Sequence, residues 1–291
     1  MKEKIREYAK KLNIDCFGVL SAEPMEDLRE ILIQKRAQFG VTPFEEDDVE
    51  LRVNPKKTME DAKSILVFLF PYYNGEEGAQ NVSKYARIPD YHKVVKAYLE
   101  KICAFIHALE PEAKCLCFSD DAPLADKFLA YKAGLGFFGK NTLLISEKHG
   151  SFCFIGYIIT NLFLEPDTPV QKDCGACTLC MDACPGKAIT KEGLSAEHCV
   201  SYLTQSKHLT KEQEGILKSQ NFVYGCDICQ DVCPYNQKIP KTNILEFSKP
   251  VLLDFQKETL REMTNREFLK EYGNFPFSWR GKSAISKNFG K

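Results

Sequence analysis

The sequence from residue 174 to residue 185 reads Cys174-Gly-Ala-Cys177-Thr-Leu-Cys180-Met-Asp-Ala-Cys184-Pro185. Gaps of two, two and three residues, with proline after the last cysteine, are typical of the ferredoxin run that binds [4Fe–4S] clusters. Three thiolates on one tight loop reach three corners of a cubane, and the fourth cysteine turns away toward a second cluster. Zinc is the alternative, but it favours separated Cys-x-x-Cys pairs or added histidines.

A second motif, Cys226-Asp-Ile-Cys229-Gln-Asp-Val-Cys233-Pro234, repeats the end of this run without its first cysteine. Cys199 precedes it and can supply the missing ligand, which closes the count at eight ligands for two cubanes. The crossover rule then predicts two sets of four. The first predicted set is Cys174, Cys177, Cys180 and Cys233, and the second is Cys184, Cys199, Cys226 and Cys229.

The composition and charge of the whole chain limit the class of protein to which this cysteine run belongs. The chain has 291 residues, 13 cysteines and a net charge of −1, so any nucleic-acid contact must be a local basic patch. Its longest apolar run, Ile65–Phe70, is too short for a membrane helix, and the charged N-terminus lacks a signal core. We therefore expect a cytoplasmic protein with no membrane contact. The cysteines outside the motifs are interpreted as buried small hydrophobes: Cys16, Cys103, Cys115, Cys117 and Cys153.

Hydrophobic periodicity predicts the secondary structure of the N-terminal half. Strands are predicted at Ile14–Leu20, Ser64–Phe70, Lys114–Phe118 and Ser151–Thr160, the last in a hairpin with Thr142–Ile145. Helices are predicted at Lys2–Leu12, Met25–Gln38, Tyr91–Leu109 and Leu124–Ala133, with another at Asn265–Tyr272. Helices mixed with strands that need not be parallel indicate an α+β fold.

A change of composition at Glu165-Pro-Asp-Thr-Pro169 suggests the domain boundaries. We expect a catalytic domain at 1–165, a two-cluster ferredoxin domain at 166–240 and a short helical tail at 241–291. The tail is basic at its end, with Arg280, Lys282, Lys287 and Lys291 and no acid after Phe277. Two clusters form an electron relay, and a relay needs an acceptor, which we expect in residues 1–165.

Two motifs of the N-terminal half have competing interpretations. Gly134-Leu-Gly-Phe-Phe-Gly139-Lys140-Asn141 matches glycine-rich nucleotide motifs, but a helix precedes it and a strand follows it, the reverse of the order that a phosphate site needs. Ser119-Asp120-Asp-Ala-Pro123 precedes a helix, so Asp120 is either a helix cap or a general acid.

The chain resembles the epoxyqueuosine reductase family, whose members complete the queuosine base of tRNA. The motifs that carry the resemblance span nearly the whole chain. They are Asp90-Tyr-His-Lys93, Asp120-Asp-Ala-Pro123, Lys132-Ala-Gly-Leu-Gly-Phe137, Gly139-Lys-Asn-Thr142, Thr160-Asn161, the cysteine run, Cys199-Val-Ser-Tyr-Leu-Thr-Gln205, Tyr224-Gly-Cys-Asp-Ile-Cys-Gln230 and Ser278-Trp-Arg-Gly-Lys282.

The resemblance implies a cobalamin cofactor in an N-terminal nitroreductase-like domain, similar to that of reductive dehalogenases, fed by two [4Fe–4S] clusters. It implies that Asp120 protonates the oxygen leaving an epoxide, in a partly apolar pocket that favours the protonated acid. For His92, a structural role and a substrate contact both stay open. The positions that look like cobalamin contacts are Arg52, Asn141, Thr142, Ser151, Ser201, Gln205 and Tyr224.

The implied partners are tRNA carrying epoxyqueuosine in its anticodon loop and an unidentified low-potential electron donor, with the protein acting as a monomer. Longer family members continue into helical repeats that grip tRNA, so we expect a grip here that is either smaller or supplied by the basic tail. Cys184-Pro-Gly-Lys-Ala188 also replaces the family's usual Pro-Thr-Gly-Ala. Two alternatives remain: a corrinoid dehalogenase-like enzyme acting on a small molecule, and a two-cluster electron carrier without enzymatic activity.

Overall fold

The computed structural model describes residues 1–249 and 252–289, which separate into two compact units. Unit 1 comprises Met1–Pro71, His92–Gly139 and Leu143–Asp173. Unit 2 comprises Tyr72–Tyr91, Lys140–Thr142 and the described part of Cys174–Lys291. The predicted domains are consecutive ranges, whereas both compact units combine segments that are distant in the sequence.

Unit 1 is built on a four-stranded antiparallel sheet with the order β1-β2-β6-β3. Its strands are β1 (Cys16–Ser21), β2 (Ser64–Pro71), β3 (Cys115–Phe118) and β6 (Cys153–Thr160). Every residue of β2 is buried, because this strand has a neighbour on each side and helices on both faces. The antiparallel sheet with its helices confirms the expected mixture of helices and strands.

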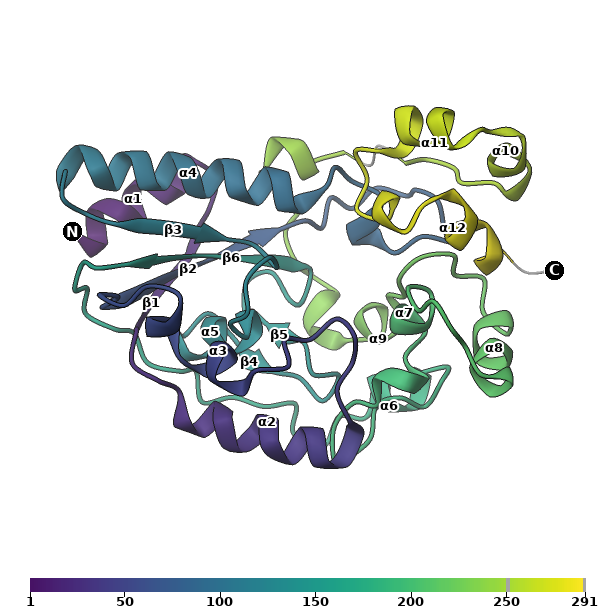
Figure 1. The fold of residues 1–291 in the computed structure, drawn as a ribbon, viewed down its shortest axis with the longest axis horizontal. Helices are drawn as coiled ribbons and strands as arrows, with labels where there is room; N and C mark the ends of the chain where they lie inside the picture. Colours follow the sequence, from purple (N-terminus) through teal and green to yellow (C-terminus); the bar gives the residue numbers. More distant parts are fainter. Residues whose placement is uncertain (250–251, 290–291) are drawn as a thin grey trace. The chain divides into compact units, whose positions relative to one another are not determined.

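Helices cover both faces of this sheet (Figure 1). On one side lie α1 (Lys2–Lys11) and α4 (Tyr91–Leu109), where the rings of Tyr8 and Phe105 stack at 4.2 Å. On the other side lie α2 (Glu26–Phe39), α3 (Val49–Val53) and α5 (Asp126–Lys132), which share a buried core with β2. A side chain on Gly18 would lie 2.1 Å from the Ala133 carbonyl oxygen, so β1 needs glycine where the end of α5 approaches.

The predicted strands and helices of unit 1 are found within two or three residues of their expected ends. The predicted hairpin is wrong. The two-residue strand β5 (Leu144–Ile145) pairs with β4 (Phe137–Phe138), and only an isolated bridge between Ser146 and Gly150 precedes β6. The physical reason is burial, since β6 is apolar on both faces and is covered when it lies between β2 and β3.

Unit 2 consists of short helices and loops. Its helices are α6 (Leu179–Ala183), α7 (Val200–Leu203), α8 (Lys211–Lys218), α9 (Ile228–Asp231), α10 (Lys257–Glu262), α11 (Asn265–Tyr272) and α12 (Lys282–Asn288). An aromatic core joins residues 79–86 to 223–224 and to the C-terminal helices. A much smaller apolar cluster lies among the cysteines, around Cys184 and Ala188.

The predicted helix Asn265–Tyr272 is confirmed, with a capping box in which Thr264 and Glu267 exchange hydrogen bonds. Lys291 of the predicted basic tail lies outside the described residues. In the part of the chain that the structure describes, every helix is too short or too polar to cross a bilayer.

Candidate iron–sulfur and active sites

The eight motif cysteines are distributed over loops and helix ends of unit 2. Cys174 and Cys177 precede α6, Cys180 lies within it and Cys184 ends it. Cys199 precedes α7, Cys226 precedes α9, Cys229 lies within it and Cys233 follows it. Contacts between α6 and α9 bring the two motifs together, although 46 residues separate Cys180 from Cys226 in the sequence.

Mutual electrostatic repulsion shows which thiols are neighbours. The charged form of Cys180 is opposed by Cys174, Cys177 and Cys233, and that of Cys233 by Cys174 and Cys177. The charged form of Cys226 is opposed by Cys199 and Cys184. Cys229 faces Cys226, Cys199 and Cys184, with Cys180 as its one neighbour from the other group. These groups contain the same residues as the two predicted ligand sets.

Burial governs the charge state of these thiols. It raises the pKa of Cys226 to about 12 and raises the pKa of Cys229 further. Thiols crowded together out of water resist ionisation unless a cation compensates them, and iron supplies that charge in a cluster. The donor set therefore fits thiolate-bound iron.

Two polar anchors hold the cysteine loops. The Lys140 ammonium donates hydrogen bonds to the carbonyl oxygens of Gly175 (2.7 Å) and Cys177 (2.9 Å). This lysine belongs to the glycine-rich motif, and here it contacts the first cysteine loop rather than a nucleotide phosphate.

The second anchor is Asp227, between Cys226 and Ile228. This buried carboxylate accepts hydrogen bonds from the Ser83 hydroxyl (2.5 Å) and the Lys84 backbone N–H (2.6 Å). Burial raises the pKa of Asp227, and its hydrogen bonds oppose that rise. Sequence reasoning placed Asp227 in a family motif but gave it no role. Its partners lie more than 140 residues away, so the sequence carries no signal of the contact.

Asp120 lies in unit 1, in the turn between β3 and α5. Its backbone has a φ of +61°, a strained conformation for a residue with a side chain, and its carboxylate is 65% exposed. The Nε2 atom of His92 lies 3.9 Å from its Oδ2. The expected apolar pocket around Asp120 is not found in this conformation, because the strained turn directs the carboxylate outward.

A carboxyl group with a raised pKa lies next to Asp120: that of Asp126, which sequence reasoning missed. Its Oδ2 accepts a hydrogen bond from the Asp120 backbone N–H at 3.2 Å. Burial, reinforced by repulsion from Asp120, raises the pKa of Asp126 to about 8. The raised pKa favours the protonated form of Asp126, which lies beside the turn that carries Asp120.

Three buried polar atoms near these carboxylates have no hydrogen-bond partner: Arg52 Nε, Ser119 Oγ and Tyr157 OH. Both Arg52 and Tyr157 lie within electrostatic range of Asp126. Arg52 also pairs with Glu45, with Nη1 3.2 Å from Oε2. Unpaired buried polar atoms are uncommon and indicate a bound ligand or ordered water. This part of unit 1 therefore fits a polar ligand beside Asp120.

The remaining predicted cobalamin contacts are divided between the units. Ser151 is buried in unit 1, whereas Asn141 and Thr142 belong to unit 2. Three others form one network in unit 2: the Gln205 amide donates to the Ser201 carbonyl oxygen (3.2 Å), and the Tyr224 hydroxyl donates to Gln205 Oε1 (3.1 Å). Trp279 Nε1 donates to the same hydroxyl at 3.0 Å, a partner that sequence reasoning did not single out.

Comparisons with known proteins find family models that match both the cysteine region and part of the N-terminal half. Residues 173–236 match the family model described as a 4Fe-4S double cluster binding domain, which defines an iron–sulfur protein. Residues 52–121 match the model described as "Epoxyqueuosine reductase QueG, DUF1730". The epoxyqueuosine reductase of Lactococcus garvieae is 37% identical over 99% of this chain and 85% of its own length. The chain belongs to the epoxyqueuosine reductase family.

Solved structures agree. A crystal structure of epoxyqueuosine reductase with an epoxyqueuosine-modified tRNA stem loop matches with a TM-score of 0.89 and 34% identity, over 99% of this chain and 79% of that one. The Bacillus subtilis enzyme, with its catalytic aspartate loop swung out of the active site, matches with a TM-score of 0.88 and 33% identity, over the same shares. A catabolic reductive dehalogenase shares the fold alone, with a TM-score of 0.50 and 17% identity over 83% of this chain and 32% of that one.

Proposed function

We propose that this protein reduces epoxyqueuosine to queuosine in tRNA, using cobalamin and two [4Fe–4S] clusters. The observation that carries the proposal is the arrangement of the eight cysteines in two neighbouring groups, within a chain of this family. The reaction opens the epoxide to an alkene and releases its oxygen as water, which consumes two electrons and two protons. Clusters carry one electron at a time, so two of them suit a relay.

Asp120 is the proposed proton donor to the departing oxygen. The exposed carboxylate and strained backbone suit a turn that changes position when substrate binds. The Bacillus subtilis relative provides a precedent, since its catalytic aspartate loop has been observed swung out. Asp126 is hydrogen-bonded to the Asp120 backbone, and its raised pKa favours the neutral form, which limits negative charge beside the acid.

Cobalamin, when bound, supplies the cobalt centre through which electrons reach the substrate carbon. Arg52, Ser119 and Tyr157 offer unpaired polar atoms for a ligand beside the acid, and Ser151 lies in the same unit. In unit 2, Asn141, Thr142, Ser201, Gln205 and Tyr224 are the proposed further contacts. The family resemblance is the support for these individual assignments.

A basic groove in unit 2 supports tRNA as the partner. Six basic side chains and one carboxylate, that of Glu214, line the groove. The basic residues are Lys207, Lys218, Lys257, Arg261, Arg280 and Lys287. Two buried polar atoms of this region, Arg280 Nε and Ser286 Oγ, have no partner and are suited to phosphate oxygens. Arg280 and Lys287 belong to the basic tail that we expect to contact tRNA.

The test is anaerobic turnover of an epoxyqueuosine-containing anticodon stem loop by the holoenzyme, with cob(II)alamin and a low-potential reductant. We expect queuosine formation, with kcat reduced about 10²- to 10⁴-fold in Asp120→Asn, as is usual for loss of a general acid. The exposed neighbour provides the control: Asp121→Asn keeps the hydrogen-bond acceptor for Ser119 N–H and is expected to retain activity.

Other results would favour the alternatives. Saturable binding of cob(II)alamin, monitored by its electron paramagnetic resonance signal, together with turnover of small organohalides but not of the stem loop, would indicate a dehalogenase-like enzyme. Cluster reduction with no cobalamin binding would leave an electron carrier.

A further inference from the structure

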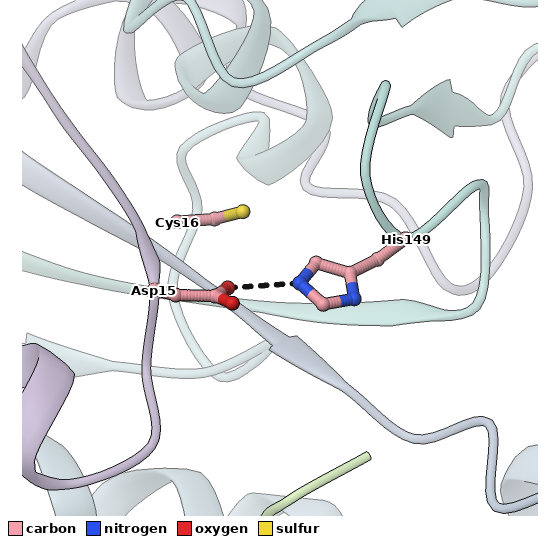
Figure 2. Close-up of side chains that lie close together, drawn as sticks. All are labelled: Asp15, Cys16 and His149. Atoms are coloured by element: carbon pink, nitrogen blue, oxygen red, sulfur yellow. Dashed lines mark hydrogen bonds and ion pairs between the residues drawn. The ribbon is translucent and has the colours of Figure 1, made fainter. Parts of the chain in front are cut away.

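A second group of ligand-type side chains lies in unit 1, apart from the motif cysteines. Asp15 and Cys16 lie at the start of β1, and His149 lies in the turn that precedes β6 (Figure 2). One ligand atom of each residue lies within 4.8 Å of the other two. The three side chains come from two separate segments and point toward one another.

The imidazole is fixed in place. The His149 side chain is 5% exposed, and its Nε2 atom lies 2.8 Å from Asp15 Oδ1. The Cys16 thiol is within hydrogen-bonding reach of both Asp15 and the buried hydroxyl of Ser146. Asp15 is 31% exposed, which leaves the cluster one side open to solvent.

The two oxygens of Asp15 have different neighbours. Oδ2 contacts the ammonium group of Lys148, whereas Oδ1 faces His149. Lys148 is 58% exposed and lies on the outer side of the carboxylate. A cation bound through Oδ1 would therefore keep Lys148 as a second partner of the same carboxylate, an arrangement that orients metal ligands.

We propose that Asp15, Cys16 and His149 bind one zinc ion, with a water molecule as fourth ligand on the exposed side. Carboxylate oxygen, thiolate sulfur and imidazole nitrogen are the donors that zinc accepts, and three protein ligands with one water is its usual open arrangement. On binding, the S–H bond of Cys16 breaks, the S–Zn bond forms, and the proton goes to solvent. The His149 nitrogen that binds zinc gives up the hydrogen shared with Asp15, and the neutral ring keeps its proton on the other nitrogen. Thiolate and carboxylate together balance the double positive charge.

This site is independent of the proposed reductase activity, because it uses none of the residues assigned to the clusters, to cobalamin or to acid catalysis. The competing interpretation is an ordinary partly buried ion pair of Asp15 with His149 and Lys148. The two interpretations differ at Cys16, because an ion pair has no use for its thiol.

The experiment is anaerobic equilibrium dialysis of the cluster-loaded holoenzyme against zinc chloride, followed by metal analysis and zinc X-ray absorption. We expect one zinc per chain, with one sulfur at about 2.3 Å and nitrogen or oxygen ligands at about 2.0–2.2 Å. Cys16→Ser and His149→Asn should each lower zinc affinity at least tenfold. Cys117→Ser removes a thiol from the opposite edge of the same sheet and should leave binding unchanged.

Three results would overturn the proposal: no bound zinc, the same affinity in Cys16→Ser, or a shell of sulfur alone, which would indicate zinc in the cluster sites. Asp15→Asn preserves the shape of the side chain and serves if another variant fails to fold. Circular dichroism of each variant establishes that the sheet is intact, so lost binding can be attributed to the missing ligand.

Discussion

The central strands of unit 1 and the cysteine loops of unit 2 are organised by different forces. β2 is a run of eight buried residues held between neighbouring strands and two helix layers. The cysteine loops have helices of four and five residues and a small apolar cluster around Cys184, Ala188 and Ile189. Helices this short are unstable by themselves in water. Apolar burial dominates the sheet, whereas polar anchors such as Lys140 and Asp227 hold the loops, which we expect bound clusters to stabilise further.

The sharpest test of this difference is Cys229→Ser, which we expect to have the largest effect. Loss of one thiolate from a buried four-sulfur set should remove one cluster and reduce bound iron by about half. Hydrogen exchange should then accelerate across residues 199–233 while β2 stays protected. Iron analysis and hydrogen-exchange mass spectrometry measure the two outcomes. Equal loss of protection in β2 would contradict the separation of the two regions.

The reverse experiment weakens the sheet and leaves the cysteines intact. Leu69→Ala truncates a fully buried side chain in β2 and should lower the free energy of unfolding by about 2–5 kcal/mol. Iron content at 25 °C should stay at the wild-type level. Urea denaturation followed by far-ultraviolet circular dichroism measures the first effect. A variant that loses iron in proportion to its stability would show that the regions fold as one.

Asp126 supplies a pH-dependent test within unit 1. Its pKa is raised to about 8 in the folded protein, whereas an aspartate in the unfolded chain titrates near its ordinary pKa of 3.8. Between these values the folded state binds the extra proton, so this group's contribution to stability is present at low pH and declines as pH rises toward 8. Asp126→Asn should remove this decline. Between pH 5 and pH 8, the melting temperature of this variant should rise relative to that of the wild type. The difference should be roughly 2–4 °C for each kcal/mol of unfolding free energy that the wild type loses.

Asp61→Asn is the matched control for that measurement. The ion pair with Lys114 lowers the pKa of the exposed Asp61 carboxylate, so its small contribution is lost at acid pH, the opposite sign. Under the proposed function, turnover by the wild type should also fall above pH 8 as Asp126 ionises beside Asp120. A pH profile that Asp126→Asn leaves unchanged would remove Asp126 from the site.

The smallest expected effect concerns the network around Tyr224. Tyr224→Phe removes the hydroxyl that connects Gln205 and Trp279, at a cost of about 0.5–1.5 kcal/mol. Trp279 is the one tryptophan of the chain, so its fluorescence reports the change in unit 2 directly. An emission spectrum identical to that of the wild type would show that the indole N–H is satisfied elsewhere.

Particular elements show how far sequence reasoning reached. The apolar run Ile65–Phe70 predicted a buried strand, and the structure has β2 at Ser64–Pro71, because only a strand with covered faces accepts such a run. The hairpin between Thr142–Ile145 and Ser151–Thr160 was wrong because two adjacent strands can also pair with distant partners, a choice that local sequence does not encode.

For the candidate sites too, some features could be predicted from the sequence and others depended on the fold. The spacing of the cysteines indicated eight thiolate ligands and predicted how the two motifs share two clusters. A cluster imposes its own geometry on any chain that binds it. Asp120 was found from its motif, but its exposure and the raised pKa of the neighbouring Asp126 were not, because burial depends on neighbours from the whole fold.

The sequence by itself thus predicted the helices and strands of unit 1 and the family, and it indicated the proposed thiol ligands. Only the tertiary structure decided that the pKa of Asp126 is raised, where Lys140 and Asp227 anchor the loops, and that Asp15, Cys16 and His149 meet. Periodicity and spacing are local properties of the chain. Desolvation and contacts between segments more than 100 residues apart exist only once the chain has folded.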